Sequence, residues 1–325
     1  EENNILRLLD SICRQKGRYE ILVINDHSDD LTVLKIEQFI EQKKKNNIKI
    51  FHLIEETNSP KKSAITLAIQ KAKGDIIVTT DGDCIVPKNW IRVIEEAFQD
   101  DKTKMLLGGV RYSPTKNLFE TIQAYELSAL LSLSLTMAED KKPFTCNGAN
   151  LAYRKETFLE VDGFDGIDQI ASGDDELLMK KIFSKDPDSI TVQRDAFVDT
   201  FPNTTLIQFF HQRIRWASKW KYGTWKEKMP GAFLMLLYIS LLLIPLSPTD
   251  NIINKVGVYF AFILLFLKFI LDNILITMTY IQDNKKNDFS YLISFVLFII
   301  YPFYVIIFGL TATFLKFSWK GRRLR

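Results

Sequence analysis

Cysteine is scarce in this sequence, and its distribution excludes two kinds of cysteine-dependent structure. Only Cys13, Cys84 and Cys146 occur in the 325 residues. Because they are odd in number, far apart and in no metal-ligand spacing, the sequence indicates neither a disulfide framework nor a zinc site. Unpaired cysteines of this kind fit a reducing compartment.

The sequence also lacks a large excess of charge of either sign. Its formal net charge is +3, and no stretch interleaves basic and aromatic residues as proteins that grip single-stranded nucleic acids do. We therefore expect no nucleic acid among its partners. We also expect no signal peptide at the start of this sequence, where Glu1 to Asn4 is more typical of the middle of a domain than of its start.

Helix and strand patterns alternate over the first 110 residues. Short β-branched runs follow stretches whose apolar residues repeat at helical spacing. This alternation predicts an α/β fold with a doubly wound, mostly parallel sheet. Strands are expected at 19–24, at 48–54 and between Gly74 and Gly82, and helices at 31–45, at 61–73 and from Trp90 onward.

Carboxylates follow two of the predicted strands. Asp81 and Asp83 come directly after the strand between the glycines, and Asp26 follows the first visible strand. Open α/β sheets bind ligands beyond the carboxyl ends of their strands, and hard oxygen ligands suit Mg²⁺ or Mn²⁺ bound to substrate phosphates. Two simpler interpretations stay open, because Asp-Gly-Asp is common in polar turns and Asp26 could cap the next helix.

Three consecutive acids, Asp174, Asp175 and Glu176, are expected to open another helix. The helix dipole favours acids in a first turn, so a purely structural role is one interpretation. Adjacent carboxylates also repel one another, which favours a raised proton affinity in at least one of them. A general base needs such an affinity.

Apolar residues are concentrated after residue 230, in three segments. The segments 256–281 and 289–315 exceed the length that a bilayer requires, whereas 231–247 is marginal. Lys268 and Asp272 lie inside the second segment at helical i,i+4 spacing, so they can pair with each other or face protein.

Two amphipathic helices are expected before these segments. The stretch 118–137 has a long apolar face that acids and serines interrupt, which favours a place in the core or at a membrane surface over a membrane crossing. The stretch 204–228 combines an aromatic face with a basic face. Such a helix is typical of a membrane interface.

Together these features resemble the membrane-bound family 2 glycosyltransferases, which have the GT-A fold. The resemblance covers nearly the whole chain and implies a further strand ahead of Glu1. It rests on four motifs in the family's order. These are Asp26, Asp81-Gly82-Asp83, Gly173-Asp174-Asp175-Glu176, and Gln212-Arg213-Ile214-Arg215-Trp216, which matches the family pattern Gln-x-x-Arg-Trp.

The resemblance implies a role for each motif. Asp26 would accept from the nucleotide base, and Asp175 would be the catalytic base. Lys61 aligns with a family lysine, although the family has glycine where Pro60 stands. The implied donor-binding residues are Asp26, Lys61, Asp81, Asp83, Gln212, Arg215 and Trp216; the acceptor-binding residues are Asn147, Gly148 and Trp216; the catalytic residues are Asp175 and Asp174; and the ligands of Mg²⁺ or Mn²⁺ are Asp83 and Asp81.

The implied function is inverting transfer of a sugar from a nucleotide-diphosphate sugar, with UDP as the expected nucleotide, to a lipid-linked or glycan acceptor of the cell envelope. A processive polysaccharide synthase is the first alternative, because Phe144-Thr145-Cys146 also resembles an element of those enzymes. The second alternative, a membrane protein that binds nucleotide sugars without catalysis, would have no use for Asp175.

The sequence predicts three regions: a catalytic domain at 1–203, an interfacial helix at 204–230 and a membrane region at 231–325. Nucleotide sugars are cytosolic, so we expect the catalytic domain on the cytosolic side of the cytoplasmic membrane. Three full crossings would place the basic C-terminal tail outside, against the positive-inside tendency. One segment, either 231–247 or the last one with Pro302, is therefore expected not to cross.

Overall fold

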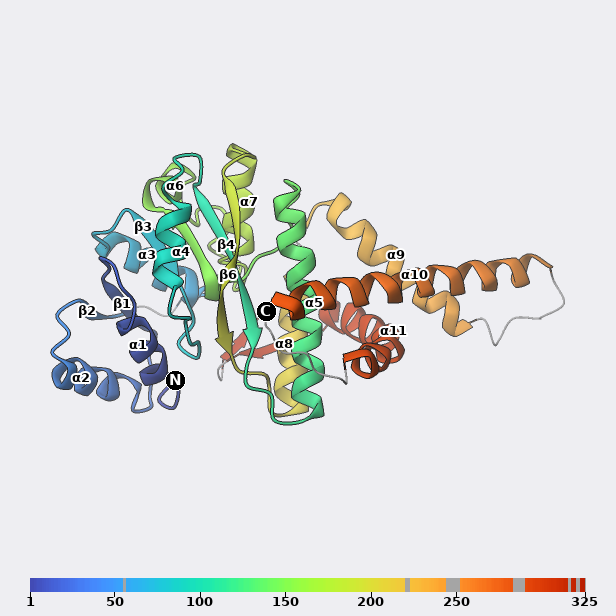
Figure 1. Cartoon of the computed structure of the whole chain (residues 1–325), viewed down its shortest axis with the longest axis horizontal. Coiled ribbons are helices and arrows are strands. Elements are labelled where there is room, and N and C mark those ends of the chain that lie inside the picture. Colours follow the sequence, from blue (N-terminus) through green and yellow to red (C-terminus); the bar gives the residue numbers. More distant parts are fainter. Residues whose placement is uncertain are drawn as a thin grey trace. The chain divides into compact units, whose positions relative to one another are not determined.

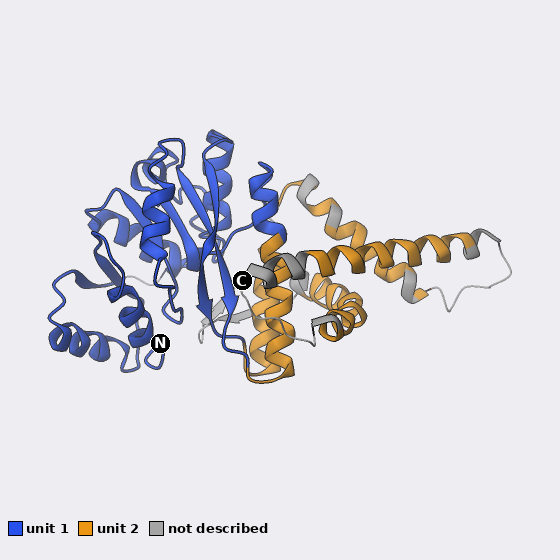
Figure 2. Cartoon of the chain, viewed as in Figure 1, with its two compact units in different colours: residues 1–115, 133–202 blue, residues 116–132, 203–325 orange. Residues whose placement is uncertain are grey.

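The structure, a computed structural model, describes residues 1–54, 57–219, 223–243, 252–282, 290–314, 317–319 and 322–324. The chain forms two compact units, which Figure 2 colours separately. Unit 1 comprises residues 1–115 and 133–202, and unit 2 comprises residues 116–132 and 203–325. Helix α5 (Leu118–Glu139) contributes residues to both units.

Unit 1 contains the predicted alternation of helices and strands (Figure 1). Helix α3 begins at Pro60, where the missing N–H and the fixed φ of proline suit a first helical position. The elements of unit 1 other than α5 are α1 (Ile5–Cys13), β1 (Ile21–Asn25), α2 (Thr32–Lys43), β2 (Ile48–His52), α3 (Pro60–Lys71), β3 (Ile76–Thr79), α4 (Trp90–Ala97), β4 (Met105–Tyr112), the 3₁₀ turn η1 (Gly148–Asn150), β5 (Leu151–Arg154), α6 (Lys155–Glu160), α7 (Glu176–Lys185) and β6 (Ile190–Thr200).

The strands of unit 1 form two sheets, one parallel and one of mixed direction. β1 and β2 pair in parallel, with Ile21 opposite Ile48. The other sheet has the order β3-β5-β4-β6, in which β4 and β6 are parallel and β5 runs antiparallel to both neighbours. The predicted α/β class is confirmed, and the four-stranded sheet is mixed because β5 runs antiparallel between β3 and β4.

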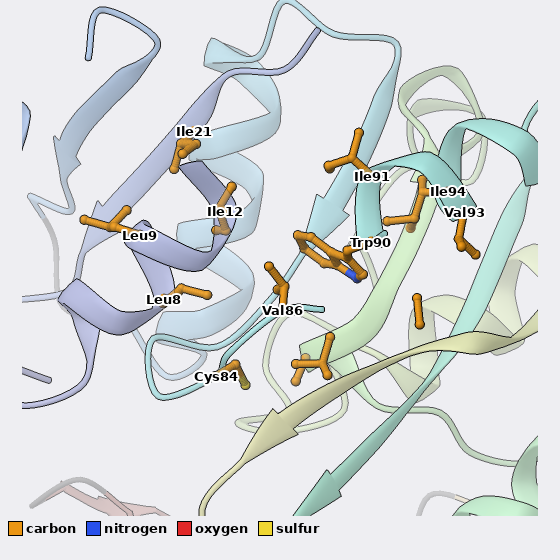
Figure 3. Packing of buried hydrophobic residues seen from close by; sticks show 14 of the residues in the cluster. Leu8, Leu9, Ile12, Ile21, Cys84, Val86, Trp90, Ile91, Val93 and Ile94 are labelled. Atoms are coloured by element: carbon orange, nitrogen blue, oxygen red, sulfur yellow. The ribbon is translucent and has the colours of Figure 1, made fainter. Parts of the chain in front are cut away.

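Helices α1 and α4 supply much of the core of unit 1, as Figure 3 shows. Leu9 and Ile12 of α1 and Trp90 and Ile94 of α4 are all less than a tenth exposed. The indole N–H of Trp90 donates to Asn150 Oδ1 at 2.9 Å. Asn150 closes the 3₁₀ turn before β5, so the core holds this turn in place.

Unit 2 contains the helices that follow residue 203. Thr205 caps α8 by accepting from the backbone N–H of Gln208, and α8 ends at Ser218, earlier than the stretch 204–228 predicts. The elements that follow are α8 (Leu206–Ser218), α9 (Trp225–Leu243), α10 (Ile252–Gln282), α11 (Ser290–Phe314), β7 (Phe317–Trp319) and β8 (Arg322–Leu324).

A buried ion pair joins α8 to α5 within unit 2. The Arg213 guanidinium contacts the Glu126 carboxylate, and the two side chains are 1% and 5% exposed. Arg213 also stacks on the rings of Phe209 and Trp216. Arg213, one of the basic residues of this helix, is therefore buried, and Glu126 compensates its charge inside the unit.

Two described helices are long and apolar enough to cross a membrane. They are Val256–Ile274 in α10 and Leu292–Thr311 in α11, with mean hydropathies of 1.8 and 2.5. The apolar part of α9, Gly231–Ser240, is shorter; the predicted first segment continues beyond residue 243, outside the described residues. Lys268 and Asp272 form the ion pair that their spacing predicts.

Candidate functional site

Lys61 brings together acidic residues that are far apart in the sequence. It lies in the first turn of α3, and its Nζ is 2.9 Å from Asp81 Oδ1 and 3.2 Å from Asp174 Oδ2. Burial opposes the charge of Lys61, but the carboxylates of Asp174, Asp81 and Asp175 outweigh it and raise the pKa of Lys61 well above its usual value. The ammonium is therefore charged throughout the neutral range.

Gly148 lies at the centre of this group. Its backbone N–H donates to Asp175 Oδ2 at 3.0 Å, and its carbonyl accepts from the Thr79 hydroxyl at 2.6 Å. A Cβ at this position would lie 3.2 Å from Asp174 Oδ2 and 3.3 Å from Lys61 Nζ. Only a residue without a side chain fits here without displacing its neighbours.

The acidic triplet does not open a helix as the sequence predicts. Helix α7 begins at Glu176, Asp175 is its N-cap, and Asp174 precedes the cap. Gly173, at φ +78°, turns the chain in a conformation that side chains disfavour. The three acids therefore differ in environment. Asp174 pairs with Lys61, Asp175 accepts hydrogen bonds from backbone N–H groups, and Glu176 pairs with Lys180 at 2.9 Å.

Asp83 and Asp26 lie at the ends of the strands that the sequence predicts. Asp83 follows β3 and contacts Cys84 Sγ through Oδ1 at 3.8 Å. Burial, with the charges of Asp81 and Asp83 in support, raises the pKa of the Cys84 thiol to about 12. Asp26 follows β1, and its Oδ1 lies 3.1 Å from His27 Nδ1. Cys84 is consequently a buried, neutral thiol next to the acidic turn.

A divalent metal fits the acidic turn if the substrate supplies most of its ligands. Within the described residues, no group of three or more His, Cys, Asp or Glu side chains could hold a metal ion. Mg²⁺ commonly takes one or two carboxylates together with substrate phosphates and water, and Asp81 and Asp83 offer that donor set. At Asp81 the metal would share the carboxylate with the ammonium of Lys61, which contacts Oδ1.

The remaining predicted residues have distinct local roles. Asn147 accepts from the backbone N–H of Ala149 and so caps the turn that contains Gly148. Gln212 lies on α8 in unit 2, where it accepts from Asn203 and from Arg213 at 2.8 Å. Arg215 and Trp216 lie in the same helix. Gln212, Arg215 and Trp216 therefore belong to unit 2.

Sequence reasoning missed two contributors to the site. Thr79, the last residue of β3, fixes the carbonyl of Gly148, and the strand pattern gave no reason to single it out. Lys62 has no counterpart among the motifs of the resemblance, in which only its neighbour Lys61 aligns with a family residue. A lysine on the buried face of a helix nevertheless indicates that its ammonium has partners inside the protein, and Lys62 is 3% exposed.

Residues 1–161 match a family model described as "Glycosyl transferase family 2". The match includes Asp26, Lys61, Asp81 and Asp83 and ends before the acidic triplet. No curated protein matches the sequence.

Several solved structures are similar to this chain at low sequence identity. The mannosyltransferase PcManGT from Pyrobaculum calidifontis, in complex with GDP-Man and Mn²⁺, is 14% identical with a TM-score of 0.55, over 97% of this chain and 84% of that one. S. aureus TarS is 17% identical with a TM-score of 0.46, and GalNAc-T7 with UDP, GalNAc and Mn²⁺ is 16% identical with a TM-score of 0.48. Both cover 67% of this chain, which spans 38% of TarS and 48% of GalNAc-T7. The likeness to PcManGT, with the family match, confirms the expected GT-A fold.

Proposed function

Because residues 1–161 belong to glycosyl transferase family 2, we propose that this glycosyltransferase inverts configuration as it moves a sugar from a nucleotide-diphosphate sugar to a membrane-associated, lipid-linked acceptor. One observation carries the proposal. Lys61 contacts Asp81, inside the family match, and Asp174, beyond it. A donor-side carboxylate and the acidic motif thus meet at one ammonium group.

On the donor side, Asp26 receives the nucleotide base, and Asp83 with Asp81 would hold a divalent metal, Mg²⁺ or Mn²⁺. PcManGT, whose structure contains GDP-Man and Mn²⁺, supports a donor and a metal of these classes. When bound, the metal supplies positive charge for the leaving diphosphate. Lys61 adds a permanent charge close by, since its pKa is raised well above the usual value.

Asp175 is the proposed base for the acceptor. Its carboxylate accepts from the N–H groups of Gly148 at 3.0 Å and Glu176 at 2.7 Å, which fixes its orientation. It takes the proton from the acceptor hydroxyl as that oxygen bonds to the anomeric carbon. The bond from this carbon to the diphosphate breaks, and its electron pair leaves with the diphosphate oxygen. Attack opposite the leaving group inverts the configuration.

We place the acceptor in a membrane. Helices α10 and α11 are long and apolar enough to cross one, and α10 exposes large apolar side chains such as Phe260 and Phe266, each more than 60% exposed. Two crossings after a cytosolic catalytic unit would return the basic tail to the cytosol, in accord with the positive-inside tendency. A cysteine in place of Ser318 that reacts with an impermeant reagent outside intact cells would contradict this topology.

Donor binding can be tested without knowledge of the acceptor. Thermal unfolding is measured with UDP-sugars and GDP-sugars, with and without Mn²⁺, because a ligand that binds the folded state raises the Tm. We expect one nucleotide sugar to stabilise the protein in the presence of the metal, and Asp83→Asn to lose that shift. The anomeric configuration of the product then tests inversion, and a ladder of products instead of a single glycolipid would favour a polysaccharide synthase.

A further inference from the structure

Two consecutive lysines in the first turn of α3 have different partners. Lys61 contacts the carboxylates of the site, whereas Lys62 is directed into unit 1 and is 3% exposed. The ammonium of Lys62 donates to three backbone carbonyls of the loop that precedes Asp174. These carbonyls belong to Ile167 (2.6 Å), Ile170 (2.7 Å) and Ser172 (3.2 Å).

This arrangement matches donors to acceptors. An ammonium group has three N–H donors, and the loop supplies three carbonyl oxygens. A buried charge is tolerated only when such partners replace water. Residues 167–172 lie outside helices and strands, and of the three carbonyls that of Ile167 also accepts from the backbone N–H of Ile170 at 3.2 Å. Lys62 therefore contributes to the conformation of this loop and is not merely accommodated by it.

The same end of α3 holds the loop through a second side chain. The Ser59 hydroxyl donates to the carbonyl of Ile170 at 2.7 Å, and Ser59 is also buried, at 3% exposure. Just beyond the loop, Gly173 turns the chain into Asp174, which pairs with Lys61. Donor-side and acceptor-side groups are thus fixed by one helical turn.

We propose that Lys62 is a positioning residue, whose ammonium fixes the loop 167–172 to the first turn of α3 and thereby sets the place of Asp174 and Asp175. The inference rests on the proposed function for its catalytic consequence. Lys62 does not touch the reacting groups in this account. It acts through the loop, and its loss changes the rate of acceptor deprotonation more than the affinity for the donor.

The test compares Lys62→Met with Lys71→Met, which removes an exposed lysine from the last turn of the same helix. For Lys62→Met we expect kcat to fall by about tenfold to a hundredfold, while the dissociation constant of the donor stays within threefold and amide hydrogen exchange in 167–173 accelerates. Lys71→Met should match the parent in all three. Ser59→Ala, which removes one bond to the loop and no charge, should show a smaller loss of kcat of the same kind.

The following results would overturn the positioning role of Lys62. A Lys62→Met enzyme with the parent kcat and faster loop exchange would contradict the positioning role, and so would a donor affinity that falls in parallel with kcat. If Lys62→Met does not fold, Ser59→Ala decides instead: an unchanged kcat in that variant overturns the inference. If the parent transfers no sugar from any donor, the proposed function fails. The loop-exchange comparison between Ser59→Ala and the parent then tests the structural link by itself, and unchanged exchange overturns it.

Discussion

Replacing Gly148 with alanine should slow catalysis without lowering stability. The added methyl group would lie 3.2 Å from Asp174 Oδ2, 3.3 Å from Lys61 Nζ and 3.5 Å from Asp175 Cβ, so at least one neighbour must move by a few tenths of an ångström. A misplacement of 1 Å can lower a rate by about 10²-fold. If the logarithm of the rate falls in proportion to the displacement, a shift of about 0.3 Å lowers kcat by about threefold to sixfold.

Stability should change little, because two effects oppose each other. Crowding in a packed site destabilises by about 1 kcal/mol, whereas alanine in place of glycine stabilises by about 0.4–1 kcal/mol through the unfolded chain. Gly148 does not have a positive φ, so no backbone strain is added. Gly74→Ala is the matched control, since its Cβ would meet only the Ile76 carbonyl, at 3.7 Å.

The assay is the initial rate of nucleoside diphosphate release at saturating donor, together with the Tm of each variant. We expect Gly148→Ala to lose rate at an unchanged Tm and Gly74→Ala to keep the parent rate. Gly148→Val, which adds a larger side chain, should lose much more of the initial rate than Gly148→Ala. Equal rates in Gly148→Ala and Gly74→Ala would refute the argument that the methyl group disturbs the contact between Lys61 and Asp174.

Three further predictions follow from particular contacts. Asp175→Asn should keep donor affinity and lose about two to four orders of magnitude in kcat, the range for a general base; loss of turnover in Asp174→Asn alone would transfer that role to Asp174. Glu126→Gln should lower the free energy of unfolding by about 3 kcal/mol, because it leaves the buried charge of Arg213 uncompensated; chemical denaturation of the parent and the variant checks this, and a difference under 1 kcal/mol would contradict it. Cys84, whose pKa is raised to about 12, should resist iodoacetamide at pH 8 in the folded protein, which alkylation followed by mass spectrometry would show. Because the folded thiol holds its proton to higher pH than the unfolded one, the contribution of Cys84 to stability is present below about pH 8.5 and is lost as the pH rises toward 12. Unfolding measured at several pH values checks this loss of stability.

The local elements of unit 1 could be predicted because short-range patterns determine them. The strand Ile76–Thr79 and its acidic exit are recognisable from a β-branched run between glycines, and helix α3 from a proline at its start. The direction of β5 could not be predicted in this way, because pairing with β3 and β4 joins residues about 75 and 45 positions apart. Periodicity carries no information on such partners.

The contacts of the site were less predictable than its residues. The sequence identified Lys61 and Asp174 separately, but only the fold places their side chains 3.2 Å apart. The prediction of a helix through Asp174 was wrong, because Gly173 introduces a turn that delays the helix to Glu176. The burial of Arg213 could not be predicted from local pattern, because its buried partner Glu126 lies 87 positions earlier in the sequence.

The most direct test of the central claim measures two products of one reaction. The purified protein, in detergent with extracted membrane lipid, is given the nucleotide sugar that stabilises it, and both free nucleoside diphosphate and glycosylated lipid are quantified. The account predicts equal molar amounts of the two products and the inverted anomeric configuration in the glycosylated lipid. Asp175→Asn should give neither product within the same time. Donor binding without release of nucleoside diphosphate, or release without a glycosylated lipid, would contradict it.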